Sequence, residues 1–307
     1  MRSARDLPSF DASLWRCALV GCALLTGCTN IAPPKSVPPT GDAALERMRG
    51  GAACADGLQA SAKIDYYGDQ GRVRGELLMI AKRPASLRMD IVSPFGATLA
   101  TLTSDSTKFA LADLRNKQFL FGPAKTCNIA RLTHMPIPAP ALVDLLRGVA
   151  PVLKRSSPAT IAWDRHGYYV VTIASTRQAN EVIHLAPHPD DMGRPWEEQR
   201  LRLKFFSVEQ AGKEMYHAEL DEHAAAKSLV VEASPEDIVA GIAPAANGAA
   251  CNIEVPRVVH VESPSTGDDV LFRYSDISWN PTPDPSIFTQ MPAAGLERGF
   301  VGCADGE

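Results

Sequence analysis

Apolar and polar residues alternate along the segment Leu58-Gln59-Ala60-Ser61-Ala62-Lys63-Ile64-Asp65-Tyr66, and this segment decides the fold. The turn-forming residues Gly68-Asp69-Gln70-Gly71 follow it, and the alternation returns from Val73 to Ile80. Alternation at period two is typical of a strand with one buried face, and a short turn between two such runs predicts a hairpin. Residues 58–80 are therefore expected to form two antiparallel strands.

The same pattern continues along the chain. Further strands are expected at 85–92, 97–103, 108–114, 117–121, 160–163, 168–174, 181–185, 199–209, 213–220, 257–261 and 270–279. Apolar residues at helical spacing predict helices at 41–49, 124–132 and 141–149. The sequence thus predicts a mainly β protein with a few helices (α+β), in which about eleven antiparallel strands form a curved sheet or open barrel with helices packed on or into it.

The first residues are typical of a bacterial lipoprotein signal peptide. Basic residues precede a short apolar run from Cys17 to Leu25, which ends in Leu25-Thr26-Gly27-Cys28. The run is too short to span a bilayer, which needs roughly 20 residues, but it suits the hydrophobic region of a signal peptide. We expect residues 1–27 to be removed and Cys28 to be acylated. The alternative is an ordinary secretory signal with an incidental cysteine.

Residues 28–41 are rich in proline and are expected to form a lipidated, semi-rigid tether that holds the body some way from the membrane. Thr29 rather than Asp follows Cys28, which is compatible with export to the periplasmic face of the outer membrane. Residues 42–307 show no internal repeat and no clear boundary, so they are expected to form one domain.

Composition excludes some functions. The net charge is −4, and no run of five Lys or Arg occurs, which argues against a nucleic-acid partner. Four of the seven cysteines lie beyond the anchor: Cys54, Cys127, Cys251 and Cys303. In an oxidising compartment they predict two disulfides, for which three connectivities are open. One of these joins Cys54 to Cys303 and would tie together the two ends of the domain.

Catalytic and metal-binding motifs are lacking. The sequence has no G-x-S-x-G, phosphate-loop or H-E-x-x-H motif. The segment His184-Leu185-Ala186-Pro187-His188-Pro189-Asp190-Asp191 has some of the residue types of a metal site, but a polar loop is the better interpretation. We therefore expect a protein that is not an enzyme and that needs neither a metal nor a cofactor.

Two motifs carry a resemblance to a known family. The turn Ser93-Pro94-Phe95-Gly96, and the run Leu132-Thr133-His134-Met135-Pro136-Ile137-Pro138 before a Leu-rich helix ending at Arg147-Gly148, resemble the LolB family of outer-membrane lipoprotein receptors. The resemblance is best over residues 58–151. It implies the fold shared with the soluble LolA-like carriers, an incomplete β-barrel closed by helices around an apolar cavity that takes acyl chains. It also implies acylated lipoproteins or lipids as partners, and a LolA-like carrier as a further one.

The resemblance assigns roles to particular residues. Pro94, Phe95 and Gly96 would form the protruding loop that helps to deliver cargo to the membrane; the alternative is a turn whose Phe packs on the core. An apolar concave face can hold hydrocarbon if the helices leave room, and each candidate for it can equally be ordinary core. The candidates are Leu87, Met89, Ile91, Leu99, Phe109, Leu111, Phe119, Tyr169, Val171, Leu203 and Phe205.

Two functions are compatible with these expectations. The first is reception and insertion of lipoproteins, or binding of other lipids, at the outer membrane. The second is an envelope-stress sensor or a partner-binding subunit that uses the same shell. The chain is longer than the family pattern and carries four additional cysteines, so the cargo is left open.

Overall fold

The structure is a computed structural model that describes residues 30–69, 71–228, 239–240 and 251–303. The expected signal peptide (1–27) and the expected acylation site Cys28 lie outside the described residues. Within the described part of the chain, no helix is long and apolar enough to cross a membrane.

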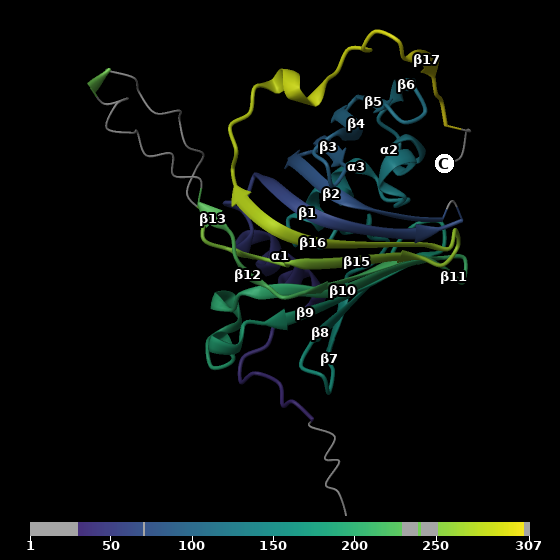
Figure 1. Ribbon diagram of the computed structural model, residues 1–307. Coiled ribbons are helices and arrows are strands. Elements are labelled where there is room, and N and C mark those ends of the chain that lie inside the picture. The colour runs from purple at the N-terminus through teal and green to yellow at the C-terminus, as the bar shows by residue number, and fades with distance from the viewer. Residues whose placement is uncertain (1–29, 70, 229–238, 241–250, 304–307) are drawn as a thin grey trace, which may run out of the picture.

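The protein is mainly β, as the alternation predicted (Figure 1). The helices are α1 (Gly41–Gly51), α2 (Thr126–Thr133) and α3 (Ala139–Leu146), with short 3₁₀ turns η1 (Pro189–Asp191), η2 (Trp196–Glu198) and η3 (Pro285–Phe288). The strands are β1 (Gly57–Gly68), β2 (Gly71–Lys82), β3 (Ser86–Val92), β4 (Thr98–Asp105), β5 (Lys108–Asp113), β6 (Gln118–Pro123), β7 (Thr160–Trp163), β8 (Tyr169–Ala174), β9 (Ala179–Pro187), β10 (Leu201–Gln210), β11 (Lys213–Asp221), β12 (Ala224–Ala225), β13 (Lys227–Ser228), β14 (Glu254–Val255), β15 (Val258–Ser263), β16 (Asp268–Trp279) and β17 (Glu297–Phe300).

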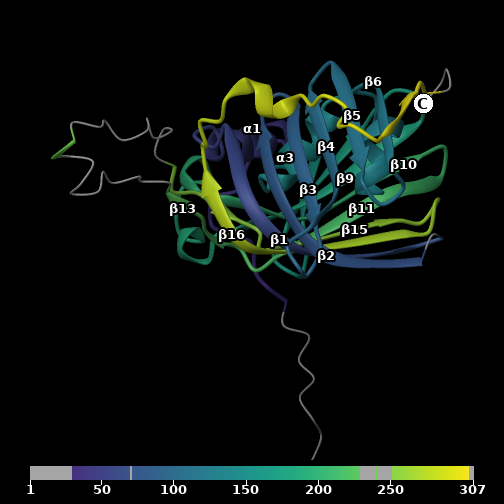
Figure 2. The same cartoon turned by 45° about the horizontal axis from the view of Figure 1, so that its top comes forward.

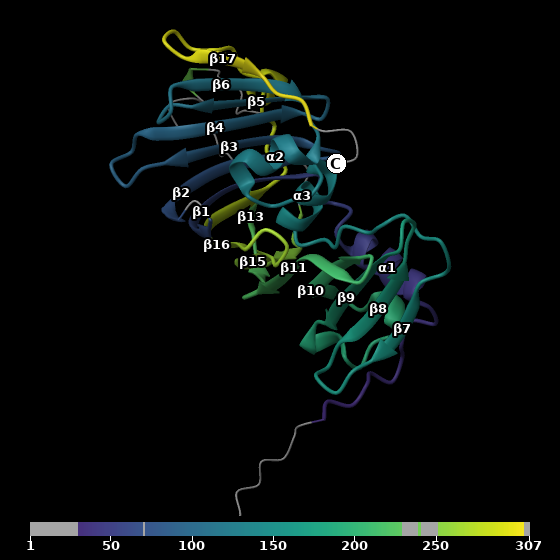
Figure 3. The ribbon, with the colours of Figure 1, turned by 90° about the vertical axis from the view of Figure 1, so that its right-hand side faces the viewer.

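Most of the described strands belong to one large sheet. Its strand order is β17-β6-β5-β4-β3-β2-β1-β16-β15-β11-β10-β9-β8-β7, with β13 beside β16. Neighbours are antiparallel except for β17 beside β6 and β13 beside β16. Figure 3 shows the sheet bending between an arm of β1 to β6 and an arm of β7 to β10. The sheet is curved but does not close, because β17 and β7 stand at its two edges.

The hairpin of residues 58–80 is confirmed. Leu58 lies opposite Ala81 and Tyr66 opposite Val73, so β1 and β2 are paired over their whole length. The prediction of about eleven strands was too low: the thirteen predicted ranges all correspond to strands of the sheet, and the described part of the sheet has fifteen. Among the missed strands, β13 has only two residues and β17 follows a proline-rich tail, so neither carries an alternating pattern that could be recognised.

The three helices lie on the inner side of the curve, as Figure 2 shows for α1 and α3 behind the strands. Helix α1 packs against β7, β8 and β10, α2 against β5, and α3 against β2 and β3. Thr40 caps α1, because its Oγ1 accepts a hydrogen bond from the Ala43 N–H at 3.1 Å. Arg147, at the end of α3, is buried and donates from Nε to the Ala55 carbonyl at 2.6 Å, which ties α3 to the end of α1.

The two disulfides join Cys54 to Cys251 and Cys127 to Cys303, with Cα–Cα distances of 5.4 and 6.1 Å. Two bridges are present, as predicted, but the bridge from Cys54 to Cys303 is wrong. After β16 the chain crosses the outer face of the sheet and runs beside β6, so Cys303 ends next to α2 rather than near α1.

The described part of the proline-rich tether, residues 30–41, packs along the body. The Ile31 N–H donates to the Arg165 carbonyl at 3.0 Å, and the Trp163 indole N–H donates to the Ile31 carbonyl at 2.9 Å. Further on, Gln199 Nε2 donates to the Ser36 carbonyl at 3.0 Å. Residues 31–36 therefore lie along the body and do not extend freely from it.

Candidate functional site

The turn between β3 and β4 presents Phe95 to solvent. The turn is closed by hydrogen bonds from the Gly96 N–H to the Ser93 carbonyl (2.9 Å) and from the Ser93 N–H to the Ala97 carbonyl (2.8 Å). Gly96 has a φ of 80°, which a residue without a side chain adopts most easily. The Phe95 side chain is 96% exposed, so the alternative in which it packs on the core is wrong.

The inner face of the sheet is occupied by core. Of the eleven cavity candidates, seven are buried there: Leu87, Met89, Phe109, Leu111, Tyr169, Val171 and Leu203. The helices and the segment before α3 cover this face with apolar side chains that are themselves fully buried: Met135, Ile137, Leu142, Val143, Leu145 and Leu146. These candidates are therefore packed side chains, and the structure does not confirm the predicted apolar cavity.

Phe205 points away from the core. A register shift between Leu203 and Phe205 places Phe205 opposite His184 and Phe206 opposite Ile183. Such a bulge inserts one residue and reverses the alternation beyond it. Phe206 is consequently fully buried, whereas the half-buried Phe205 lies against the His184 ring at 5.0 Å between ring centres.

Three other cavity candidates are either only partly buried or buried on the outer face of the sheet. Ile91 packs against the core but is only partly buried. The pairing of β3 with β4 shifts register at Leu99, and the Leu99 side chain is half-buried. Phe119 is buried on the outer face, because the β5–β6 register pairs Leu111 with Leu120 and leaves Phe119 beside Ala112 on the other side. The inward residue of β6 is thus Leu120, packed against the core.

A groove of about 750 Å³ lies on the outer face of β5 and β6. It is bounded by Pro285–Phe300, which we call the strap and which crosses the sheet in front of β3 to β5 in Figure 2. Its outward-facing aromatic and Met side chains are Phe119, Phe121, Phe288, Met291 and Phe300. This groove was not predicted from the sequence. The available signals were Phe119 and Phe121, which alternate along β6, and Phe288 within the proline-rich tail.

Hydrogen bonds fix the strap on the sheet. The Gln290 side chain donates from Nε2 to the carbonyls of Thr101 (2.9 Å) and Ala110 (3.0 Å). Arg88 donates from Nη1 to the Ile287 carbonyl at 3.3 Å and is held by both oxygens of Asp90. Beyond the groove, β17 pairs with β6, and Cys303 is bonded to Cys127 of α2. The strap is therefore held at both ends.

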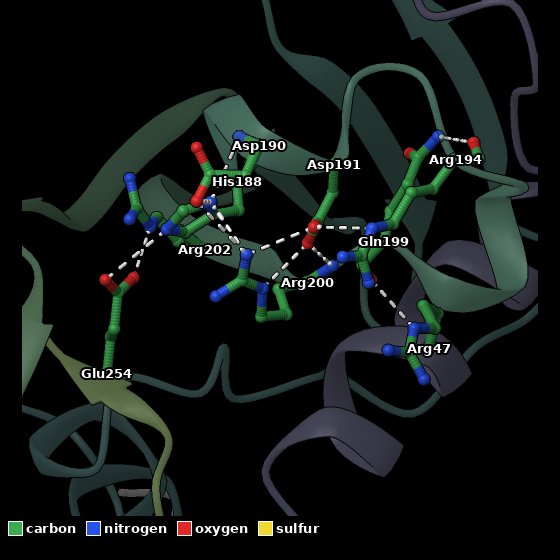
Figure 4. Close-up of polar contacts among 9 residues, drawn as sticks. All are labelled: Arg47, His188, Asp190, Asp191, Arg194, Gln199, Arg200, Arg202 and Glu254. Atoms are coloured by element: carbon green, nitrogen blue, oxygen red, sulfur yellow. Dashed lines mark hydrogen bonds and ion pairs between the residues drawn. The ribbon is translucent and has the colours of Figure 1, made fainter.

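The loop that carries His188, Asp190 and Asp191 is a structural ion-pair network (Figure 4). The hydrogen bond from Arg200 Nε to Asp191 (2.8 Å) holds the pKa of this fully buried carboxyl at about 2. Arg202 donates to Glu254 at 2.6 Å. Arginines thus neutralise these acids. Among the described residues, no three His, Cys, Asp or Glu side chains are grouped so as to hold a metal ion.

One buried carboxyl lies outside that network. Glu181 of β9 is 1% exposed, and its Oε2 accepts a hydrogen bond from the Leu153 N–H at 2.9 Å. Burial raises the pKa of Glu181 to about 7, against an ordinary 4.5. The group is hydrogen-bonded to backbone in a packed region, so we assign it no chemical role.

Comparison with known proteins gives one sequence match and several fold matches. No family model matches the chain. The outer-membrane lipoprotein LolB of Cupriavidus taiwanensis is 28% identical over 144 residues, which are 47% of this chain and 64% of that protein. The alignment therefore spans less than two thirds of LolB.

Solved structures provide the fold comparison. A DUF1329 family protein from Desulfovibrio piger superposes with a TM-score of 0.50 at 8% identity, over 81% of this chain and 96% of that chain. A LolA superfamily protein from Nitrosomonas europaea gives a TM-score of 0.45 at 13% identity, over 82% of this chain and 98% of that chain. At these identities the likeness concerns the fold. The sequence match to LolB confirms that the chain resembles the LolA/LolB-like family.

Proposed function

We propose that this protein is a non-catalytic envelope protein, anchored by an acylated Cys28, that binds the acyl chains of lipoproteins or other lipids and inserts its cargo at the periplasmic face of the outer membrane. The observation that carries the proposal is the exposure of Phe95, to which the resemblance to the LolB family would assign the role of the protruding loop. The sequence match to an outer-membrane lipoprotein LolB supports it.

The energetics of Phe95 favour contact with an apolar phase. Leaving a Phe side chain in water costs about 1.5–3 kcal/mol relative to burying it. The neighbouring turn residues Pro94 and Gly96 are also exposed, so no described side chain covers the ring. Insertion of the Phe95 ring at the boundary between headgroups and acyl chains, where Phe side chains of membrane-binding segments are buried, would recover this free energy. The turn can therefore act as the element through which cargo passes to a bilayer.

The docking of the tether on the body limits the distance between the body and the membrane. Ile31 is fixed to the β7–β8 hairpin, only three residue steps from Cys28. An acylated Cys28 would hold this edge of the sheet close to the headgroups, and multiple acyl chains give stable anchoring. The protein would thus work at a fixed, short distance from the membrane that receives the cargo.

Transfer of an acylated, radiolabelled lipoprotein to liposomes tests the proposal. Phe95→Glu should lower the transfer rate, because a charge at the tip cannot enter the apolar phase, while Phe95→Leu should keep most of it. Leu114→Glu, which changes an exposed apolar residue directly after β5, is the matched control and should transfer normally. Wild-type transfer by Phe95→Glu would show that the turn has no part in delivery.

A further inference from the structure

The outer groove faces away from the helices and the buried core. Its floor consists of side chains that point outward from β4, β5 and β6, namely Thr103, Ala110 and Phe119, and its wall is the strap. A volume of about 750 Å³ lies within the range of about 300–1,000 Å³ that is typical of small-molecule sites. The groove is thus large enough for an elongated ligand.

The groove leaves apolar side chains in water. Met291 is 88% exposed and Phe300 is 71% exposed, and Phe121 beside them is partly exposed. Phe121 and Phe300 meet edge to face at 5.7 Å between ring centres, so they form one apolar wall. The strap cannot fold away from this wall easily, since β17 is paired with β6 and Cys303 is bonded to Cys127. The apolar surface is therefore a fixed property of this face.

The floor offers little for polar recognition. The carbonyl of Ala110, on the floor, already accepts a hydrogen bond from Gln290, as does that of Thr101 in the neighbouring strand. Recognition along the floor therefore depends on apolar contact and shape, which suits a hydrocarbon chain better than a peptide backbone.

The charged residues of the groove have one sign. Among the described residues, Lys108 and Arg298 line it and no Asp or Glu does, although the whole chain carries a net charge of −4. Neither cation forms an ion pair within the described residues. Lys and Arg are the side chains that bind phosphate groups. Asp105 accepts a hydrogen bond from the Lys108 N–H at 2.7 Å but does not line the groove. An apolar cleft lined by two cations is complementary to an anionic amphiphile.

We infer that the outer groove binds an acyl chain of an anionic phospholipid, whose phosphate is held by Lys108 or Arg298. The inference rests on the proposed lipid-handling function and places a lipid site on the face of the sheet opposite the helices. Bound lipid would cover Met291 and Phe300.

Photo-crosslinking tests the inference with the acylated full-length mature protein. The protein is reconstituted into phosphatidylcholine vesicles that contain either a diazirine-bearing phosphatidylglycerol or the matching phosphatidylcholine probe. We expect crosslinked peptides from residues 118–123 and 288–300, with more product from the anionic probe. Lys108→Gln combined with Arg298→Gln should abolish the preference for the anionic probe.

Two variants and one matched control separate groove binding from nonspecific labelling. Ala110→Trp fills the floor and should lower labelling about tenfold, the effect of losing roughly two buried methylene groups. Ala112→Trp, on the same face two residues along β5 but outside the groove, should label normally. Met291→Glu changes a side chain that is 88% exposed, so it should fold normally and also lose labelling.

The possible outcomes distinguish the groove from the proposed function. Labelling confined to inner-face peptides, with lipoprotein transfer intact, would show that the groove is not the lipid site and would leave the proposed function standing. Equal labelling of wild type, Ala110→Trp and Met291→Glu would also show that the groove is not the lipid site, as would groove peptides crosslinked to a second copy of the chain. Absence of both labelling and transfer would overturn the groove and the proposed function together.

Discussion

Replacement of the buried Glu181 by Gln should make the protein more stable at alkaline pH and leave it unchanged at acid pH. The carboxyl is 1% exposed and accepts one hydrogen bond, from the Leu153 N–H at 2.9 Å. A Gln side chain has nearly the same shape and can accept the same hydrogen bond through Oε1. The substitution therefore removes the charge while keeping the packing.

The magnitude follows from the pKa of Glu181, which burial raises from 4.5 to about 7. The folded state then binds more protons than the unfolded state between these two values, so stability is lost as the pH rises through this window. At about 1.4 kcal/mol per pH unit, the loss amounts to roughly 3 kcal/mol at alkaline pH. Glu181→Gln escapes this loss, since its amide is neutral throughout.

Urea unfolding at acid and alkaline pH measures the effect. The free energy of unfolding of Glu181→Gln minus that of wild type should be near zero at about pH 4.5 and roughly +3 kcal/mol at about pH 8. Glu209→Gln, an exposed position in β10, is the control and should differ little from wild type at either pH. A difference between Glu181→Gln and wild type that does not change with pH would refute the reasoning.

Two further predictions concern the core and the strap. Phe206→Ala should destabilise the fold by about 3–5 kcal/mol, as expected for a fully buried Phe, and Phe205→Ala should cost clearly less; equal costs in urea unfolding would contradict the bulge. Removal of the second disulfide by Cys127→Ser with Cys303→Ser should cost about 2–4 kcal/mol and make the strap sensitive to limited proteolysis. An unchanged cleavage pattern in the strap would show that the disulfide does not hold it.

The parts of the fold that depend on local pattern were predictable. The hairpin of β1 and β2 has a clean period-two alternation and a turn with glycine, and both strands were found as expected. The helical spacing of Leu142, Leu145 and Leu146 likewise identified α3, whose apolar side chains are buried. These features are encoded within a few neighbouring residues, so a single sequence is enough to locate them.

Features set by long-range contacts were not predictable in the same way. Period two places Leu203 and Phe205 on one face, but the bulge in β10 moves Phe206 inward instead. The pairing of Cys127 with Cys303 depends on the route of the strap across the outer face, which no local pattern indicates. The docking of Ile31 on the β7–β8 hairpin is likewise a contact between distant segments.

The candidate site contains one feature that was predictable from local sequence and one that depends on long-range contacts. Phe95 was identified from its motif, and its exposure is what the delivery role requires. The outer groove combines Phe121 of β6 with Met291 and Phe300 of the strap, which are far apart in sequence. Their adjacency follows from the parallel pairing of β17 with β6 and is visible only once the sheet is assembled.

The central claim is that this protein carries acyl-bearing cargo, and native mass spectrometry of the acylated chain after gentle extraction tests it most directly. The account predicts a population heavier than the anchored protein by the mass of a lipid or an acylated peptide, which is lost after delipidation. Protein recovered without any such ligand, together with no transfer of radiolabelled lipoprotein to liposomes, would contradict it.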